Sequence, residues 1–230
     1  MNIQGLLKLT LLDYPGTVAC TLFTGGCNFR CPFCHNASLV FPEQFTEPIS
    51  EEEFFSFLNK RKGILDGVCI SGGEPLLQKD IVHFIIKIKE LGYKIKLDTN
   101  GSFPDKLKEL ANVNLIDHVA MDIKNSPEKY CLTSGCDKLN FSLIKESINF
   151  LLSGKISYEF RTTAVKELHD EKSFIDISEL ISGAENYFIQ NFVDSGNLIK
   201  SGYSGFTKEE LQSFVEIVRP KVKNVSLRGI

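Results

Sequence analysis

A short loop near the start of the chain carries three cysteines, Cys27, Cys31 and Cys34, in the spacing C-x3-C-x2-C. Three cysteine thiolates this close together are typical metal ligands. An iron–sulfur cube is normally held by four cysteine thiolates. A cube held by three cysteines leaves one iron with an open coordination position. At an open position a small molecule can bind and react, so the spacing indicates a cluster that takes part in chemistry.

Two other interpretations of the loop stay open at this point. The three thiolates together with His35 would make a Cys3His set, which is common in structural zinc sites. His35 directly follows Cys34 in the sequence, however, and adjacent residues rarely ligate one tetrahedral ion. A disulfide framework fits less well, because seven cysteines are an odd number and the first residues do not have the pattern of a secretory signal.

The composition is that of an ordinary globular protein. The chain has 230 residues, 43% of them hydrophobic and 24% charged, with a formal net charge of −3. We expect a single domain over residues 1–230, with no general attraction to nucleic acid or to an anionic membrane. No apolar run is as long as a membrane span, and free thiols in this number are typical of a reducing compartment. The predicted location is therefore the cytoplasm.

Apolar runs alternate with amphipathic stretches along the chain. Strands are expected over residues 18–23, 67–70, 94–97, 116–121, 157–163, 187–192 and 225–227. Helices are expected over residues 50–62, 78–91, 104–111, 140–153, 173–182 and 207–218. This alternation predicts about six parallel βαβ units, fewer than the eight of a complete barrel of about 250 residues. The predicted fold is α/β, a partial (β/α)6 TIM-like barrel, with residues 5–13 adding an N-terminal edge hairpin.

Unusual residues follow the predicted strands one after another, where parallel α/β folds collect their ligand-binding loops. They are Ser71-Gly-Gly-Glu-Pro75, Asp98-Thr-Asn-Gly101, Met121-Asp-Ile-Lys124, Arg161 and Gln190. Each also has a structural interpretation: the glycine pair as a turn, Asp98 as an Asx turn, and Asp122 with Lys124 as an ion pair. Convergence on one end of the sheet is the internal argument that they form one site.

Two of these motifs together resemble the radical S-adenosylmethionine (SAM) enzymes. Cys27-x3-Cys31-x-Phe33-Cys34 matches their cluster motif and Gly72-Gly-Glu-Pro75 their methionine-binding motif. Within that superfamily the chain resembles the activating enzymes of glycyl radical enzymes, and the pyruvate formate-lyase activase in Leu97–Gly101 and Met121–Lys124. It is most similar to the activating proteins of anaerobic ribonucleoside-triphosphate reductases. That likeness rests on Leu12-Asp-Tyr-Pro-Gly16, Cys34-His-Asn36 and Val225-Ser-Leu-Arg-Gly-Ile230.

The resemblance implies a radical SAM barrel and a defined chemistry. A [4Fe-4S] cluster would be held by Cys27, Cys31 and Cys34, and SAM would chelate the fourth iron. Reductive cleavage of SAM would give a 5′-deoxyadenosyl radical, which takes a hydrogen atom from a glycine of a partner enzyme. The implied partners are an anaerobic ribonucleotide reductase and an electron donor such as flavodoxin or ferredoxin. The alternatives are a pyruvate formate-lyase type of partner, a small-molecule substrate, or, without catalysis, a zinc-stabilised binding module.

The resemblance also implies roles for individual residues. Phe33 would contact the adenine through its backbone, and Gly72, Gly73 and Glu74 would line the methionyl amine. Lys124 would assist the SAM carboxylate. The residues that correspond to a monovalent cation site are Asp98, Thr99, Met121 and Asp122. The implied SAM-binding set also includes Asn100, in the matched segment, and Arg161. Gln190 is added to this set from its strand position.

One departure from many related activases concerns the remaining cysteines. Residues 35–66 contain no cysteine, so we expect no inserted second cluster there. Cys131 and Cys136 form a separate C-x4-C pair, for which we expect ordinary free thiols, with a metal or redox role as the alternative. Cys20 and Cys69 lie inside predicted strands and should be small buried hydrophobic residues.

Overall fold

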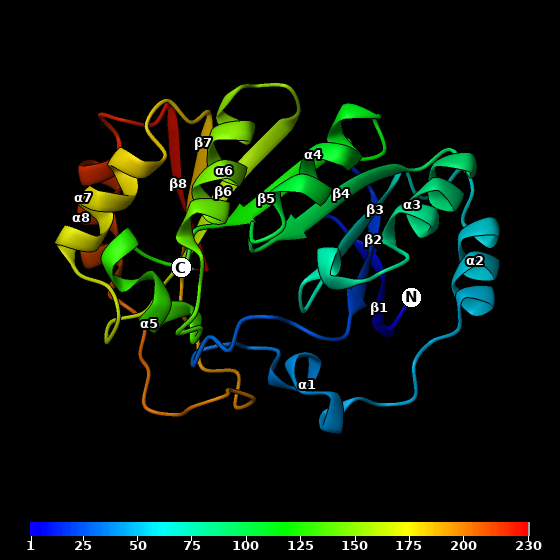
Figure 1. The fold of residues 1–230 in the computed structure, drawn as a ribbon, viewed down its shortest axis with the longest axis horizontal. Coiled ribbons are helices and arrows are strands. Elements are labelled where there is room, and N and C mark those ends of the chain that lie inside the picture. Colours follow the sequence, from blue (N-terminus) through cyan, green and yellow to red (C-terminus); the bar gives the residue numbers. More distant parts are fainter. Residues whose placement is uncertain (230) are drawn as a thin grey trace. The chain divides into compact units, whose positions relative to one another are not determined.

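The computed structural model describes residues 1–229, so Ile230, the last residue of the C-terminal match, lies outside the described residues. Eight strands follow one another in one sheet in chain order (Figure 1). They are β1 (Ile3–Thr10), β2 (Ala19–Thr24), β3 (Gly67–Gly72), β4 (Lys94–Thr99), β5 (His118–Asp122), β6 (Ser157–Ala164), β7 (Asn186–Asn191) and β8 (Asn224–Arg228). The α-helices are α1 (Ala37–Val40), α2 (Glu51–Lys60), α3 (Ile81–Glu90), α4 (Pro104–Asn112), α5 (Tyr130–Ser134), α6 (Phe141–Leu152), α7 (Glu171–Leu180) and α8 (Lys208–Val218).

The chain divides into two compact units, each described by itself. The first comprises residues 1–28, 38–99 and 105–119, and the second residues 29–37, 100–104 and 120–229 as far as described. In the first unit β1 pairs antiparallel with β2, and β2, β3 and β4 pair in parallel. The antiparallel β1 confirms the predicted hairpin at the sheet edge.

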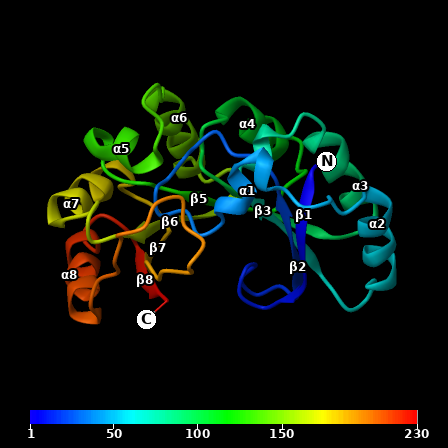
Figure 2. The same cartoon turned by 90° about the horizontal axis from the view of Figure 1, so that it is seen from below.

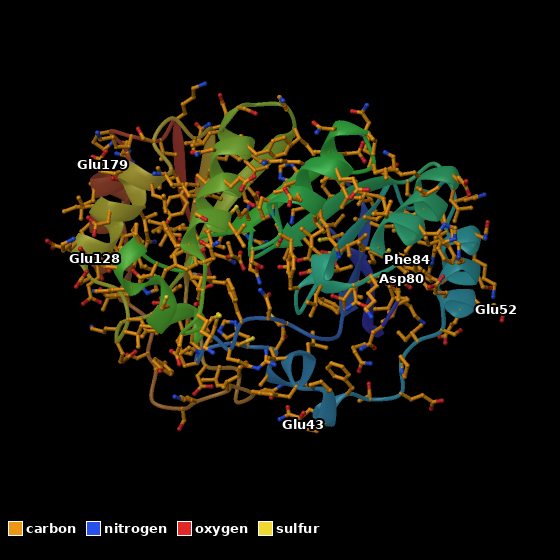
Figure 3. The ribbon with its side chains drawn as sticks, viewed as in Figure 1. Glu43, Glu52, Asp80, Phe84, Glu128 and Glu179 are labelled. Atoms are coloured by element: carbon orange, nitrogen blue, oxygen red, sulfur yellow. The ribbon has the colours of Figure 1, made fainter. Side chains whose placement is uncertain are left out.

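The two faces of β2–β4 have different chemistry, because side chains alternate along a strand. On one face Leu22, Ile70 and Leu97 are fully buried. Apolar packing continues into the helices, where Phe54 of α2 stacks on Phe84 of α3 with 5.5 Å between ring centroids (Phe84 is labelled in Figure 3). On the other face the parallel register aligns Thr21, Cys69 and Lys96, and then Phe23 with Ser71. The Ser71 hydroxyl donates to Asp98 of β4. This face ends at the loops that carry the predicted site.

The second unit repeats this arrangement with β6, β7 and β8, which also pair in parallel. Phe160, Tyr187 and Ile189 are buried on one face. The helices α7 and α8 lie against each other (Figure 2). Phe174 of α7 and Phe214 of α8 stack with 4.2 Å between ring centroids. The opposite face carries the aligned rows Arg161, Phe188 and Ser226, then Thr163, Gln190 and Arg228. Arg161 and Gln190 therefore share one face of these strands.

Every predicted strand and helix is present, with ends that differ by a few residues. Helix α3 begins at Ile81 rather than at residue 78, because Pro75–Leu77 form a 3-10 turn that is capped by the Glu74 side chain. The short helices α1 and α5 were not predicted, since four or five residues are too few to show a helical period. Among residues 1–229, none of the helices is long and apolar enough to cross a membrane.

Candidate functional site

The cysteine loop is shared between the two units. Cys27 belongs to the first unit, and Cys31 and Cys34 belong to the second. Cys31 and Cys34 lie on one turn, in which the Cys34 N–H donates to the Cys31 carbonyl at 3.0 Å. All seven cysteines are free thiols. In the part of the chain that the structure describes, no three His, Cys, Asp or Glu side chains converge into a metal-binding group.

Of the two thiols of the second unit, Cys31 is buried and Cys34 is partly buried, and Lys124 affects the pKa of both. Burial raises the pKa of Cys31 to about 11, while the nearby Lys124 ammonium acts in the opposite direction. Burial likewise raises the pKa of Cys34, against the effect of a backbone hydrogen bond and of Lys124. A thiol becomes a metal ligand as its thiolate, and a metal ion supplies the charge that removes the proton. Two free, desolvated thiols close to an ammonium group are a donor set that fits an iron–sulfur cluster.

Gly72, the last residue of β3, and Gly73, which follows it, allow two backbones to touch in the first unit. A Cβ atom on Gly73 would lie 2.0 Å from the Gly26 carbonyl oxygen, and one on Gly72 would lie 2.3 Å from the Thr24 nitrogen. Two hydrogen bonds close the contact: Gly73 N–H donates to the Thr24 carbonyl and Glu74 N–H to the Gly26 carbonyl, both at 2.8 Å. Gly72 also has a φ of +111°. This contact holds the loop after β3 against the residues directly before Cys27.

Glu74 ties that loop to the end of the next strand. Its carboxylate is fully buried, and Oε1 accepts hydrogen bonds from the Thr99 hydroxyl at 2.9 Å and from the Leu76 N–H at 3.0 Å. A buried carboxylate is stable when hydrogen bonds replace its lost water. Glu74 therefore fixes the positions of Thr99 and of the loop that precedes α3.

Asp98 is held by two partners in the first unit. Its Oδ1 lies 2.5 Å from the Lys96 Nζ, and its Oδ2 accepts from the Ser71 hydroxyl at 3.0 Å. Lys96 is only 1% exposed, and its Nζ lies 4.0 Å from the Cys69 sulfur. The sequence analysis did not single out Lys96, although its i, i+2 spacing with Asp98 on one strand was a usable signal. Cys20 and Cys69 are both buried, as predicted.

In the second unit Asp122 joins two cations. Its Oδ2 lies 2.9 Å from the Lys124 Nζ and its Oδ1 lies 3.0 Å from the Arg161 Nε. Burial alone would raise the pKa of the Asp122 carboxyl, but Lys124 and Arg161 lower it to about 2. Burial would lower the pKa of Lys124, but Asp122 raises it above its usual value. All three groups are therefore charged at neutral pH.

Met121 and Asn100, also in the second unit, shape the strand ends. A Cβ atom on Gly101 would lie 2.0 Å from the Met121 methyl carbon, so Met121 packs directly on that glycine. The Asn100 side chain accepts hydrogen bonds from the N–H and hydroxyl of Ser102, at 2.9 and 2.6 Å. The Phe33 ring is buried and packs edge-on against Phe192, with 6.4 Å between centroids.

Two buried residues near Lys124 were missed by the sequence analysis. The Tyr130 hydroxyl lies 3.4 Å from the Asp122 carbonyl oxygen, and burial raises the pKa of Tyr130. His169 accepts the Val165 N–H at Nδ1 (3.2 Å), so its Nε2 carries the proton and donates to the Lys124 carbonyl at 3.0 Å. Neither residue belongs to a sequence motif. Both contact the segment Asp122–Lys124 only in the folded chain, and a single sequence does not reveal such contacts.

Residues 21–179 match the family model of the Radical SAM superfamily. The chain belongs to this superfamily. A Methanocaldococcus jannaschii protein whose name assigns it to the glycyl-radical enzyme activating enzymes is 33% identical over 99% of this chain and 96% of its own length. The pyruvate formate-lyase-activating enzyme of Listeria monocytogenes is 36% identical over 56% of each chain.

Solved structures agree on the fold. Streptococcus suis SuiB bound to S-adenosylmethionine aligns with a TM-score of 0.70 and 16% identity, over 91% of this chain and 52% of that one. The enzyme anSMEcpe with bound AdoMet aligns with a TM-score of 0.65 and 18% identity, over 86% and 58% of the two chains. At such identities the likeness shows the fold alone, and it confirms the predicted partial barrel. The family also confirms the predicted cofactors, a [4Fe-4S] cluster and SAM, and sets aside a zinc-stabilised binding module.

The buried His169 makes stability depend on pH. Burial lowers its pKa from 6.5 to about 4 in the folded chain. Between pH 6.5 and about 4, His169 is protonated in the unfolded chain but stays neutral in the folded chain. The free energy of unfolding therefore falls as the pH falls through this range. We expect a loss of about 3 kcal/mol in the free energy of unfolding across this window. Urea titrations at a series of pH values measure it. His169→Gln should flatten the slope, whereas the same change at the exposed His83 should leave it intact.

The backbone contact at Gly72 can be tested against a matched glycine. Gly72 and Gly92 both have positive φ, but a Cβ atom on Gly92 meets nothing within 4 Å. We expect Gly92→Ala to cost about 1 kcal/mol of unfolding free energy through φ alone. Gly72→Ala should cost about 2 kcal/mol more, because its Cβ would clash with backbone that must move. Equal costs in denaturant unfolding would show that the contact with Thr24 is unimportant.

Proposed function

We propose that this chain is a glycyl-radical enzyme activating enzyme and that its partner is an anaerobic ribonucleoside-triphosphate reductase. The observation that carries the general activity is the end-to-end match to the M. jannaschii protein, which covers 99% of this chain and 96% of that protein. The choice of the reductase rests on the segments Leu12–Gly16, Cys34–Asn36 and Val225–Ile230. The free thiols support a reducing compartment, which we propose is the cytoplasm.

We propose Cys27, Cys31 and Cys34 as the cluster ligands. Their support is the donor chemistry of the loop: three free thiols within eight residues, two of them desolvated beside Lys124. When bound, the cluster supplies the electron that cleaves SAM to methionine and a 5′-deoxyadenosyl radical. The protein's own contribution is to orient the bound groups and to exclude water.

Lys124 is the proposed partner of the SAM carboxylate. An ammonium group has three N–H donors, and Lys124 gives one of them to Asp122 at 2.9 Å. The hydrogen bond to Asp122 fixes the side chain of Lys124. The hydrogen bond between His169 and the Lys124 carbonyl fixes its backbone. The positioned ammonium can therefore donate to a ligand carboxylate. Arg161 and Gln190 lie on the same strand face of their unit and complete the proposed set of SAM-binding residues.

The remaining roles follow the motif match. Gly72, Gly73 and Glu74 are the proposed amine-binding residues, and Asn100 lies at a proposed SAM-binding position. The buried Phe33 ring packs on Phe192, which leaves the Phe33 backbone as the part that a ligand adenine can contact.

The monovalent cation site stays a prediction. It would use Asp98, Thr99, Met121 and Asp122. Asp98 already pairs with Lys96, and Asp122 pairs with Lys124 and Arg161. A requirement of SAM cleavage for potassium or sodium would support the site, and full activity in their absence would remove it.

A pyruvate formate-lyase type of partner is the second candidate, favoured by the 36% identity to the Listeria enzyme. A small-molecule substrate is a weaker third. The 7-carboxy-7-deazaguanine synthase of Hyperthermus butylicus matches at 33% identity, but over only 40% of this chain. A flavodoxin or a ferredoxin is the proposed electron donor.

The partner can be identified by the radical it acquires. The reduced, cluster-loaded protein is mixed under anaerobic conditions with SAM and either an anaerobic ribonucleotide reductase or a pyruvate formate-lyase. We expect the doublet EPR signal of a glycyl radical on the reductase, and no signal when its radical-bearing glycine is changed to alanine. A signal on the lyase alone would move the proposal to the second candidate. SAM cleavage without a radical on either protein would favour a small-molecule substrate.

Lys124 offers a sharper test of the SAM site. A hydrogen bond to a charged group contributes about 1.5–3 kcal/mol, so Lys124→Met should weaken SAM binding about 10- to 100-fold. Iron content should stay unchanged, because the variant keeps all the cysteines. Lys129, a few residues further along, pairs with Asp170 and provides the control, since Lys129→Met should bind SAM normally. Unchanged SAM binding by Lys124→Met would remove this residue from the site.

A further inference from the structure

Cys131 and Cys136 lie at the two ends of a tight helix-ending turn. Helix α5 ends at Ser134, and Gly135 follows in the left-handed conformation with a φ of +61°. The Gly135 N–H donates to the Leu132 carbonyl at 3.4 Å, and the Cys136 N–H donates to the Cys131 carbonyl at 3.2 Å. This pair of bonds is a Schellman motif, in which the side chains at the positions of Cys131 and Cys136 commonly touch. Both cysteines are partly exposed free thiols.

The same turn is pressed against the cysteine loop within the second unit. The Arg30 N–H donates to the Ser134 carbonyl at 2.8 Å. A Cβ atom on Gly135 would lie 2.1 Å from the Arg30 carbonyl oxygen, so only glycine fits there. Arg30 directly precedes Cys31 in the chain. Any change that stiffens the turn therefore acts on the backbone next to a proposed cluster ligand.

We propose that Cys131 and Cys136 are a redox-active dithiol, which closes into an intramolecular disulfide by exchange with a low-molecular-weight disulfide such as oxidised glutathione. The thiolate of one cysteine attacks the small disulfide, forms a mixed disulfide and releases one glutathione thiolate. The second protein thiolate then attacks the first cysteine's sulfur and releases the second glutathione. The two protein thiols lose two electrons and two protons, and the small disulfide takes them up as two thiols.

The other cysteines outside the cluster loop do not share these features. Cys20 is fully buried, and burial raises its pKa to about 12, so it is a poor nucleophile. Cys69 is also fully buried, beside the Lys96 ammonium. A metal site at the pair is disfavoured, because two thiols alone are half of a tetrahedral set. The remaining chemistry of two adjacent, accessible thiols is disulfide exchange.

Trypsin isolates the pair in one peptide. Cleavage after Lys129 and Lys138 releases Tyr130–Lys138, which contains Cys131 and Cys136 and no other cysteine. The cluster-loaded protein is equilibrated anaerobically with a series of glutathione redox buffers, quenched in acid, alkylated and digested. We expect this peptide to become lighter by two hydrogen atoms as the buffer becomes oxidising and to lose its alkylation sites. The peptide Gly63–Lys79, which carries the buried Cys69 and no other cysteine, should stay fully alkylated throughout.

Single variants and a backbone probe complete the test. Cys131→Ser and Cys136→Ser should each give only a glutathione adduct on the remaining cysteine. In the wild-type chain, oxidation should slow hydrogen exchange at the Arg30 amide several-fold, and in either variant it should not.

A wild-type peptide that carries two alkyl groups or two glutathione adducts in the most oxidising buffer would overturn the proposal. So would a bridge from either cysteine to another part of the chain. Neither readout depends on SAM cleavage or on a partner enzyme, so the result stands apart from the proposed function.

Discussion

The cysteine loop depends on close contacts between backbones that only glycine permits. In the first unit, Gly73 lies against the Gly26 carbonyl, directly before Cys27. In the second unit, Gly135 lies against the Arg30 carbonyl, directly before Cys31. Each unit thus braces its own part of the loop at the residue that precedes a cysteine. These contacts restrict the backbone beside Cys27 in one unit and beside Cys31 in the other, and such restriction lowers the cost of ordering a ligand-bearing segment on binding.

The two units have similar ion pairs at their strand ends. Each places one strand-end carboxylate beside a lysine: Asp98 with the buried Lys96, and Asp122 with the partly buried Lys124. In the second unit Arg161 adds another cation, and the pKa of Asp122 falls to about 2 as a result. Buried charges survive only when they are paired and hydrogen-bonded, so these groups hold one another in place. The arrangement keeps Lys124 charged and oriented at a strand end, where ligand-binding loops of this fold collect.

Much of the fold could be predicted from sequence because its signals are local. Hydrophobic periodicity located all seven predicted strands and six helices, and short motifs marked the loops that follow them. Tyr130 and His169 could not be predicted, since their importance comes from neighbours distant in sequence: His169 contacts the Lys124 carbonyl from 45 residues away. Lys96 differs, because its i, i+2 spacing with Asp98 was a signal that the sequence contained. Helix α5 was missed for a related reason, because its five residues are stabilised by contact with Arg30 rather than by their own pattern. The glycine contacts show the same limit: the motif located Gly72 and Gly73, but only the structure shows which atoms require them.

The most direct measurement of the central claim is iron and sulfide analysis combined with EPR on the anaerobically reconstituted protein. We predict roughly four irons and four sulfides per chain and a reduced-cluster signal that changes when SAM is added, since three cysteines leave one iron for the ligand. Replacing Cys27, Cys31 or Cys34 by serine should abolish both the cluster and the response to SAM. A protein that binds no iron, or whose cluster signal ignores SAM, would contradict the account.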